Sequence, residues 1–262
     1  TLWVEVNILG NPVATQPLHG FKLVGHLVLA LVGSMIACAL LAVLVELVAY
    51  RRLRARGASR LSSLISAIGV SIFLLEAMRI FTESRPKSAP RLLEKWSCGE
   101  FAGANFRIDT MLVIVAPILI FILLDRFVNL SRFGKAIRAV SLSEENSKLM
   151  GININKVVTL TFVIGGLTTG AASFLYTTVY ENTVFNVGFT MGMAAFTAAI
   201  MGGIGNIRGA FYGGLALGML EQFSSAILGS QWKAVTVFVV LVMILLFKPN
   251  GLFGEAVQQT RT

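Results

Sequence analysis

The sequence predicts an all-α, polytopic integral membrane protein with about seven transmembrane or re-entrant helices. Hydrophobic residues make up 55% of its 262 residues and charged residues only 13%, against roughly 25% charged residues in soluble domains. Apolar runs of about 20 residues, long enough to cross a hydrocarbon core roughly 30 Å thick, follow one another with short breaks. Lys and Arg gather at the ends of these runs, as the positive-inside rule requires.

The net charge of +9 therefore reports membrane topology and not nucleic-acid binding. Cys38 and Cys98 form no metal or redox spacing, and His19 and His26 have no partners at a spacing that suits metal binding or catalysis. We predict no nucleic-acid partner, no metal site and no covalent chemistry. The sequence begins at Thr1 with no visible signal peptide.

The first span is expected at residues 23–50, followed by five arginines and no acid at residues 51–60. This basic loop is placed in the cytoplasm. The second span, residues 61–81, returns outward into an external loop at about residues 82–109, where Pro and Gly discourage a regular helix. A third span at residues 110–128 leads back inside.

A polar, basic segment at residues 131–156 follows on the cytoplasmic side and is the most informative part of the chain. Ser141 and Glu144 fit the S-x-x-E capping box, and Gly151 supplies a left-handed residue that ends a helix. We predict a short amphipathic helix at residues 142–150 that lies along the membrane surface. On this pattern the helix is either a simple connection or a docking surface for a soluble protein.

Four more apolar runs follow, at residues 157–179, 188–201, 210–228 and 233–247. Gly205, Gly209 and Gly213 recur every four residues, which favours close helix packing. The glycine-rich stretch at residues 201–209, which includes Gly203, predicts a broken or re-entrant helix. No G-x-x-x-x-G-K-[ST] run occurs, so any ATPase belongs to another chain.

Polar residues inside the spans are expected to turn away from lipid. Ser66 and Gly69 share one helix face, Thr169 and Ser173 share another, and Glu221 lies on the face of a glycine ridge. We interpret these five residues as the wall of a translocation path. The alternative is ordinary interhelical hydrogen bonding, worth about 0.6 kcal/mol for each bond.

Two further acids lie near span ends. Glu46 and Glu76 are expected to be satisfied locally, and Glu76 has Arg79 three residues further on.

Six short stretches keep the order that they have in a known family. They are residues 46–54 (ELVAYRRLR), 67–71 (AIGVS), 133–140 (FGKAIRAV), 149–153 (LMGIN), 201–205 (MGGIG) with Gly209, and 247–252 (FKPNGL). Together they span roughly residues 40–254 and resemble the LivH-type permease subunits of branched-chain amino acid ABC transporters. The resemblance implies a single transmembrane permease domain over residues 1–262, in the bacterial inner membrane.

The resemblance further implies a transporter subunit and not an enzyme, which moves Leu, Ile and Val. It implies two ABC ATP-binding subunits that hold ATP and Mg, a second LivM-like permease subunit and an external solute-binding protein. This chain would touch lipid and bind no cofactor. The family's usual first span and its Asn-Phe-Ala-His-Gly stretch are absent, which implies a further span ahead of Thr1.

The same resemblance makes the polar segment the coupling segment that receives an ATP-binding subunit. The residues assigned to coupling are Arg138, Ser141, Glu144, Glu145, Lys148 and Gly151. Many importers have a Glu-Ala-Ala core followed by glycine here, whereas residues 144–147 read EENS and lack the two alanines.

The sequence also fits other substrates and other classes of transport protein. Relatives within the ABC class handle urea, short amides or other amino acids. An ion-coupled secondary transporter would use Glu221 as its proton or sodium site, and a channel would need a filter or a charged ring.

Overall fold

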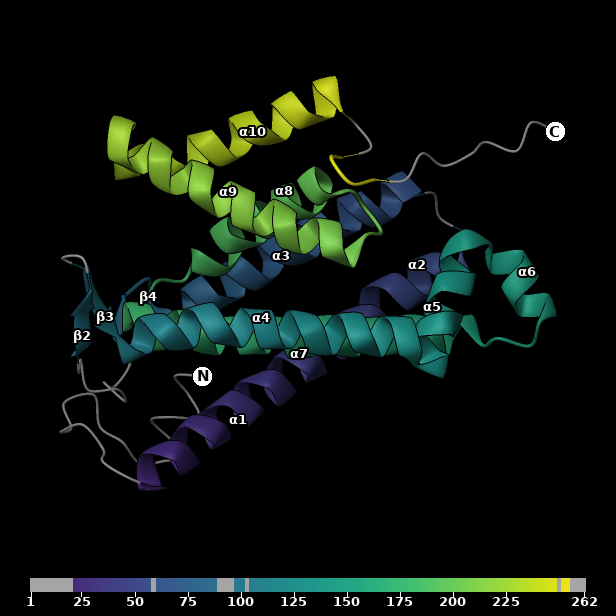
Figure 1. Ribbon diagram of the computed structural model, residues 1–262. Coiled ribbons are helices and arrows are strands. Elements are labelled where there is room, and N and C mark those ends of the chain that lie inside the picture. The colour runs from purple at the N-terminus through teal and green to yellow at the C-terminus, as the bar shows by residue number, and fades with distance from the viewer. Residues whose placement is uncertain (1–20, 58–59, 89–96, 102–103, 249–250, 255–262) are drawn as a thin grey trace. The chain divides into compact units, whose positions relative to one another are not determined.

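Figure 1 shows the computed structural model of the chain, which describes residues 21–57, 60–88, 97–101, 104–248 and 251–254. The chain divides into two compact units, Thr1–Phe185 and Asn186–Thr262. Helices dominate both units, and the strands described are short. The predicted all-α fold class is confirmed.

The helices of the first unit follow one another along the chain. They are α1 (Phe21–Val45), the π-helix η2 (Glu46–Tyr50), α2 (Arg51–Ala55), α3 (Arg60–Thr82), α4 (Ile108–Leu130), α5 (Arg132–Leu142), α6 (Glu144–Leu149) and α7 (Ile154–Tyr180). Two short antiparallel pairs complete this unit. β1 (Lys87–Ser88) pairs with β4 (Asn182–Thr183), and β2 (Ser97–Phe101) pairs with β3 (Ala104–Arg107).

The described residues of the second unit form three α-helices and one short 3-10 turn. They are α8 (Val187–Gly202), α9 (Ile207–Leu228), the 3-10 helix η3 (Ser230–Trp232) and α10 (Lys233–Phe247). Its core is a cluster of Ala198, Met201, Leu217 and Val237. These residues come from all three α-helices, so each helix contributes to one small apolar centre.

All seven apolar runs singled out in the sequence are helical. Five stretches in the described part of the chain are long and apolar enough to cross a membrane, namely Gly25–Ala55, Ile65–Thr82, Met111–Leu130, Ile154–Tyr180 and Ser230–Phe247. The other two runs are the shorter apolar helix α8 and the glycine-rich helix α9.

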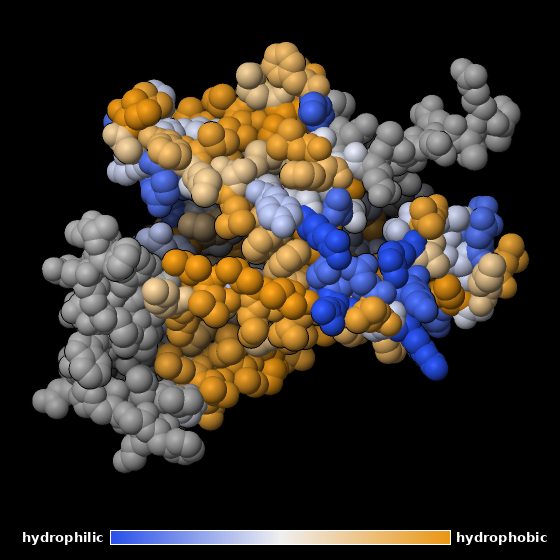
Figure 2. Space-filling view, viewed as in Figure 1, coloured by the Kyte–Doolittle hydropathy of each residue, from blue (hydrophilic) through white to orange (hydrophobic). Residues whose placement is uncertain are grey.

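The two ends of the first unit differ in character. α2, α5 and α6 lie at one end, and the strands β2, β3 and β4 lie at the other (Figure 1). The arginines of α2 and the polar segment thus share one end, as the positive-inside rule predicts for two cytoplasmic segments. Figure 2 shows hydrophilic residues gathered at the end that carries α5, beyond the apolar surface of α4.

The predicted external loop contains regular structure that the sequence did not predict. Its described residues between α3 and α4 contain no helix, as expected, but two short segments, β2 and β3, pair as strands. Alternation of side chains over four or five residues is too short a pattern to be recognised among so many turn residues. Residues 89–96 and 102–103 of this loop lie outside the described residues.

Helices α1 and α7 pack side by side in opposite directions and form the main contact of the first unit. The closest approach is at two glycines of α7. A Cβ atom at Gly166 would lie 2.6 Å from the Cα of Ala39, and one at Gly170 would lie 2.5 Å from the Cα of Met35. Glycine lets the two backbones meet at this distance.

Candidate functional site

The polar segment begins with a tight turn from α4 into α5. Ser131 caps α5 by accepting a 2.9 Å hydrogen bond from the backbone amide of Gly134. Gly134 is buried against the carbonyl group of Val128, where a Cβ atom would collide. The guanidinium of Arg138 donates to the backbone oxygen of Asn129 at 3.3 Å. These contacts fold α5 back against the end of α4.

The cap of the next helix differs from the prediction. Ser143, and not Ser141, is the N-cap of α6, and it accepts a 3.3 Å hydrogen bond from the amide of Asn146. Ser141 lies inside α5, where its hydroxyl donates to the oxygen of Arg138 at 2.8 Å. The predicted capping box is therefore wrong. The predicted helix at 142–150 is present only as the shorter α6, because Leu142 belongs to α5 and Ser143 precedes the first turn of α6. Ser143 has an extended backbone and separates α5 from α6, whereas the pattern of apolar and polar residues continues across this position without a break.

The end of α6 follows the prediction. Gly151 has a φ of +78°, its amide donates to Lys148 O at 3.0 Å, and the amide of Ile152 donates to Ser147 O at 3.0 Å. This pair of bonds is a Schellman motif, which requires a left-handed residue. Asn153 then caps α7 by accepting a bond from the amide of Lys156 at 3.2 Å.

All six residues assigned to coupling are exposed, and they lie within one helix–turn–helix segment. They are Arg138, Ser141, Glu144, Glu145, Lys148 and Gly151. Large apolar side chains share this surface, since Leu142, Leu149 and Met150 are 88%, 87% and 83% exposed. Glu144 and Glu145 lie in the first turn of α6, where their negative charges interact favourably with the positive end of the helix dipole. Mixed charged and apolar exposure of this kind suits contact with another protein.

The residues assigned to a translocation path lie on three helices. Ser66 and Gly69 are on α3, Thr169 and Ser173 are exposed on α7, and Glu221 is half-buried on α9 of the second unit. Within the first unit, the structure brings together only those of the four residues that share a helix. Among the described residues Glu221 has no hydrogen-bond or ion-pair partner.

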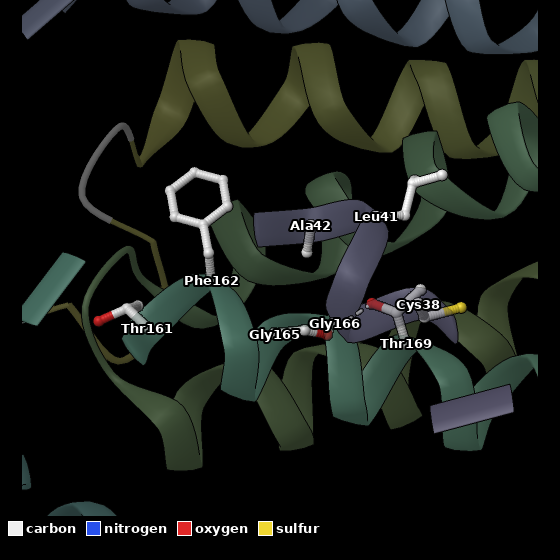
Figure 3. Close-up of a pocket in the computed structure, with 8 residues that line it drawn as sticks. All are labelled: Cys38, Leu41, Ala42, Thr161, Phe162, Gly165, Gly166 and Thr169. Carbon is white, nitrogen blue, oxygen red and sulfur yellow. Dashed lines mark hydrogen bonds between the residues drawn. The ribbon is translucent and has the colours of Figure 1, made fainter. Parts of the chain in front are cut away.

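Thr169 borders an apolar pocket of about 410 Å³ between α1 and α7. Figure 3 shows its lining, which comprises Cys38, Leu41 and Ala42 of α1 and Thr161, Phe162, Gly165, Gly166 and Thr169 of α7. The hydroxyl of Thr169 donates to the oxygen of Gly165 at 2.8 Å. The pocket therefore offers mainly apolar contacts.

The two acids near span ends differ in their surroundings. Glu76 forms a 2.8 Å ion pair with Arg79, as expected. Glu46 is completely buried, its Oε1 lies 2.7 Å from the Nη2 of Arg54, and its Oε2 accepts a 3.1 Å bond from the hydroxyl of Thr159 on α7. The sequence predicts a local partner for Glu46 but not the one on α7. The available signal was that Glu46 is the sole acid of its span.

The predicted break in the glycine-rich stretch lies between α8 and α9. Gly203 and Gly205 have φ values of +100° and +96°, and Asn206 caps α9 by accepting a 3.0 Å bond from the amide of Gly209. A Cβ atom at Gly209 would collide with the oxygen of Gly202, and one at Gly213 with the oxygen of Ala198. The first two glycines shape the turn, and the other two lie where α8 and α9 meet.

Comparison with known proteins decides the family. The family described as branched-chain amino acid transport system, permease component, matches residues 6–247. The chain belongs to this family. The expected identity as a multi-pass membrane permease, and not an enzyme, is thereby confirmed.

Individual relatives agree with this assignment. The high-affinity branched-chain amino acid transport system permease protein BraD of Pseudomonas aeruginosa is 39% identical over 96% of this chain and 84% of its own. The permease protein LivH of Escherichia coli K12 is 38% identical over 86% of this chain and 73% of its own. A probable permease protein LivM of Methanocaldococcus jannaschii is 28% identical over 60% of this chain and 48% of its own. No solved structure matches.

Proposed function

We propose that this chain is the LivH-type permease subunit of an ABC importer that carries Leu, Ile and Val into the cell. The observation that supports the proposal most is the family match over residues 6–247, together with relatives whose names specify branched-chain amino acids. Because that match covers both compact units, we treat residues 1–262 as one permease domain.

The partners belong to this proposal. Two ABC ATP-binding subunits would bind ATP and Mg, a LivM-like chain would be the second permease subunit, and a solute-binding protein would deliver the solute from outside. The similarity of LivM to this chain supports a pair of related permease subunits. The exposed surface of α5 and α6 supports docking of an ATP-binding subunit, because no described residue covers its charged and apolar side chains.

Transport then follows from differential binding. ATP binding drives the permease between inward-facing and outward-facing states only if these states contact the ATP-binding subunits differently. We place that difference at α6, through the exposed Glu144, Glu145 and Lys148. Ser66, Gly69, Thr169, Ser173 and Glu221 are proposed to line the path of the solute.

Uptake by the purified complex in proteoliposomes tests the substrate. We expect ATP-dependent uptake of labelled leucine, isoleucine and valine that requires the solute-binding protein. Preference for urea, acetamide or a polar amino acid would overturn the substrate. Uptake that needs no ATP and stops when a protonophore collapses the proton gradient would overturn the importer.

A pull-down from detergent-solubilised membranes tests the partners. We expect ATP-binding subunits to accompany the tagged chain and to be lost when residues 144–151 are replaced by a Gly/Ser linker. A shorter linker replacement at residues 83–86, at the opposite end of the unit, is the control. Recovery of the ATP-binding subunits with the 144–151 linker would place the docking surface elsewhere.

A further inference from the structure

The Glu46 carboxylate is a charge held inside the first unit. Its residue is completely buried at the start of η2, within a stretch apolar enough to cross a membrane. The ion pair with Arg54 offsets part of the desolvation cost of this charge. Well-packed apolar residues commonly stabilise such a position as well as an ion pair does. Stability of the fold alone therefore does not account for an acid at this point, and an ionisable residue inside a membrane segment indicates function.

The local backbone is also unusual. The amide of Arg51 donates to the oxygen of Glu46 itself, five residues earlier, which is the i→i+5 pairing of a π-helix. Such turns occur frequently at functional sites because they place a side chain where a regular α-helix would not. Here the π-helix joins α1 to α2 and directs Glu46 at α7.

The link from Glu46 to α7 costs little to break. The Thr159 hydroxyl lies 3.1 Å from Glu46 Oε2 and 2.9 Å from Asn155 O, and its one hydrogen can serve either acceptor. When the carboxylate moves away, the hydroxyl remains paired within α7. The Nη1 of Arg54 is buried with no partner among the described residues, so a rearrangement that gives it an acceptor would offset some of the cost of moving Glu46.

The position of this link connects it to the coupling segment. Thr159 lies six residues after the N-cap Asn153, or roughly 9 Å along the axis of α7. Asn153 directly follows the Gly151 turn that ends α6. Phe162, one turn further along α7, contacts Tyr50 with ring centroids 5.2 Å apart. Displacement of α6 would thus reach η2 through the first two turns of α7.

We propose that Glu46 is a positioning residue of the transport cycle. Its carboxylate joins η2 to α7 in one of the two transport states and releases Thr159 in the other, so that movement at α6 becomes movement of α1 against α7. This inference rests on the proposed importer function. It assigns to Glu46 a role in coupling ATP hydrolysis to solute movement and no contact with the solute.

The test measures leucine transported per ATP hydrolysed by the complete complex in proteoliposomes. Glu46→Gln keeps the size of the side chain and removes its charge. We expect the ratio to fall about fivefold or more, while the complex assembles normally and hydrolyses ATP at its basal rate. Thr159→Val removes the partner hydroxyl, whereas Glu46→Gln removes the charge that strengthens the same link between η2 and α7. The double variant should therefore lose no more than the Glu46→Gln variant.

Thr168→Val is the matched control, because the Thr168 hydroxyl bonds only to backbone oxygens of its own helix. An unchanged ratio in Glu46→Gln, an equal loss in Thr168→Val, or additive losses in the double variant would overturn the proposal. If Glu46→Gln does not fold, the Thr159→Val ratio decides. A wild-type complex that transports another solute with ATP refutes only the proposed substrate, and the ratio is then measured with that solute. A wild-type complex that moves no solute with ATP refutes both.

Discussion

The backbone amide of Leu252 donates a 2.7 Å hydrogen bond to the carbonyl oxygen of Met201. This bond ties the segment after α10 to the end of α8, next to the break that leads into α9. The side-chain amide of Asn206 adds a 3.1 Å bond to the oxygen of Phe253. Two of the stretches that resemble the permease family, residues 201–205 and 247–252, are therefore neighbours in the folded second unit.

Substitution of Gly251 should disrupt this junction. Gly251 has a φ of +79°, and a Cβ atom would lie 2.5 Å from the backbone of Gly203. Gly229, at φ +96° with open space around it, is the control for backbone strain alone. We expect Gly229→Ala to cost about 1–3 kcal/mol of backbone strain and Gly251→Ala a further 1–3 kcal/mol or so from overpacking. Thermal unfolding in detergent measures both, and equal losses would show that the junction tolerates a methyl group.

The contact of α1 with α7 gives a second stability prediction. Gly166→Ala forces a methyl group against the backbone of Ala39, so we expect a loss of about 1–3 kcal/mol. Gly165→Ala adds the same methyl group to open space at the pocket and should raise stability by up to about 1 kcal/mol through helix propensity. The midpoint of thermal unfolding distinguishes the two. A destabilised Gly165→Ala would mean that a neighbour outside this chain fills the pocket.

The positions of the helices were predictable because a membrane requires long apolar runs. The run at residues 233–247 coincides with α10, and the run at 157–179 lies within α7. α7 begins three residues earlier because Asn153 caps it. The N-cap of α6 was less predictable, because Ser141 and Ser143 both precede acidic residues. Ser143 is the cap because α5, which packs on α4, continues to Leu142. The contact between Glu46 and Thr159 joins residues 113 positions apart, and the periodicity of a sequence does not predict such a long-range contact.

Two glycines that follow helix ends, at the end of the first unit that carries the polar segment, allow coupling to be tested without unfolding the protein. Gly151 and Gly57 are both exposed, both have positive φ, and neither has atoms near a built Cβ. Alanine at either position costs about 1–2 kcal/mol of backbone strain. We expect Gly151→Ala, and likewise Glu145→Gln, to lower solute transport per ATP about fivefold, whereas Gly57→Ala should not. Unchanged ratios in both the Gly151 and the Glu145 variants would refute the placement of the coupling contact at α6.

Substitution of Glu221 distinguishes a role in transport from a role in packing. It is half-buried in a glycine-rich helix and has no partner among the described residues, so Glu221→Gln removes a charge without leaving another group unpaired. Stability should therefore change by less than about 0.5 kcal/mol. If the carboxylate attracts the ammonium group of the amino acid, leucine uptake should fall about tenfold, equivalent to a loss of roughly 1.4 kcal/mol. Gln222→Ala, at the exposed neighbouring position, controls for local disturbance of α9. Unfolding of the assembled complex at a clearly lower temperature would instead identify Glu221 as one half of an ion pair with another subunit.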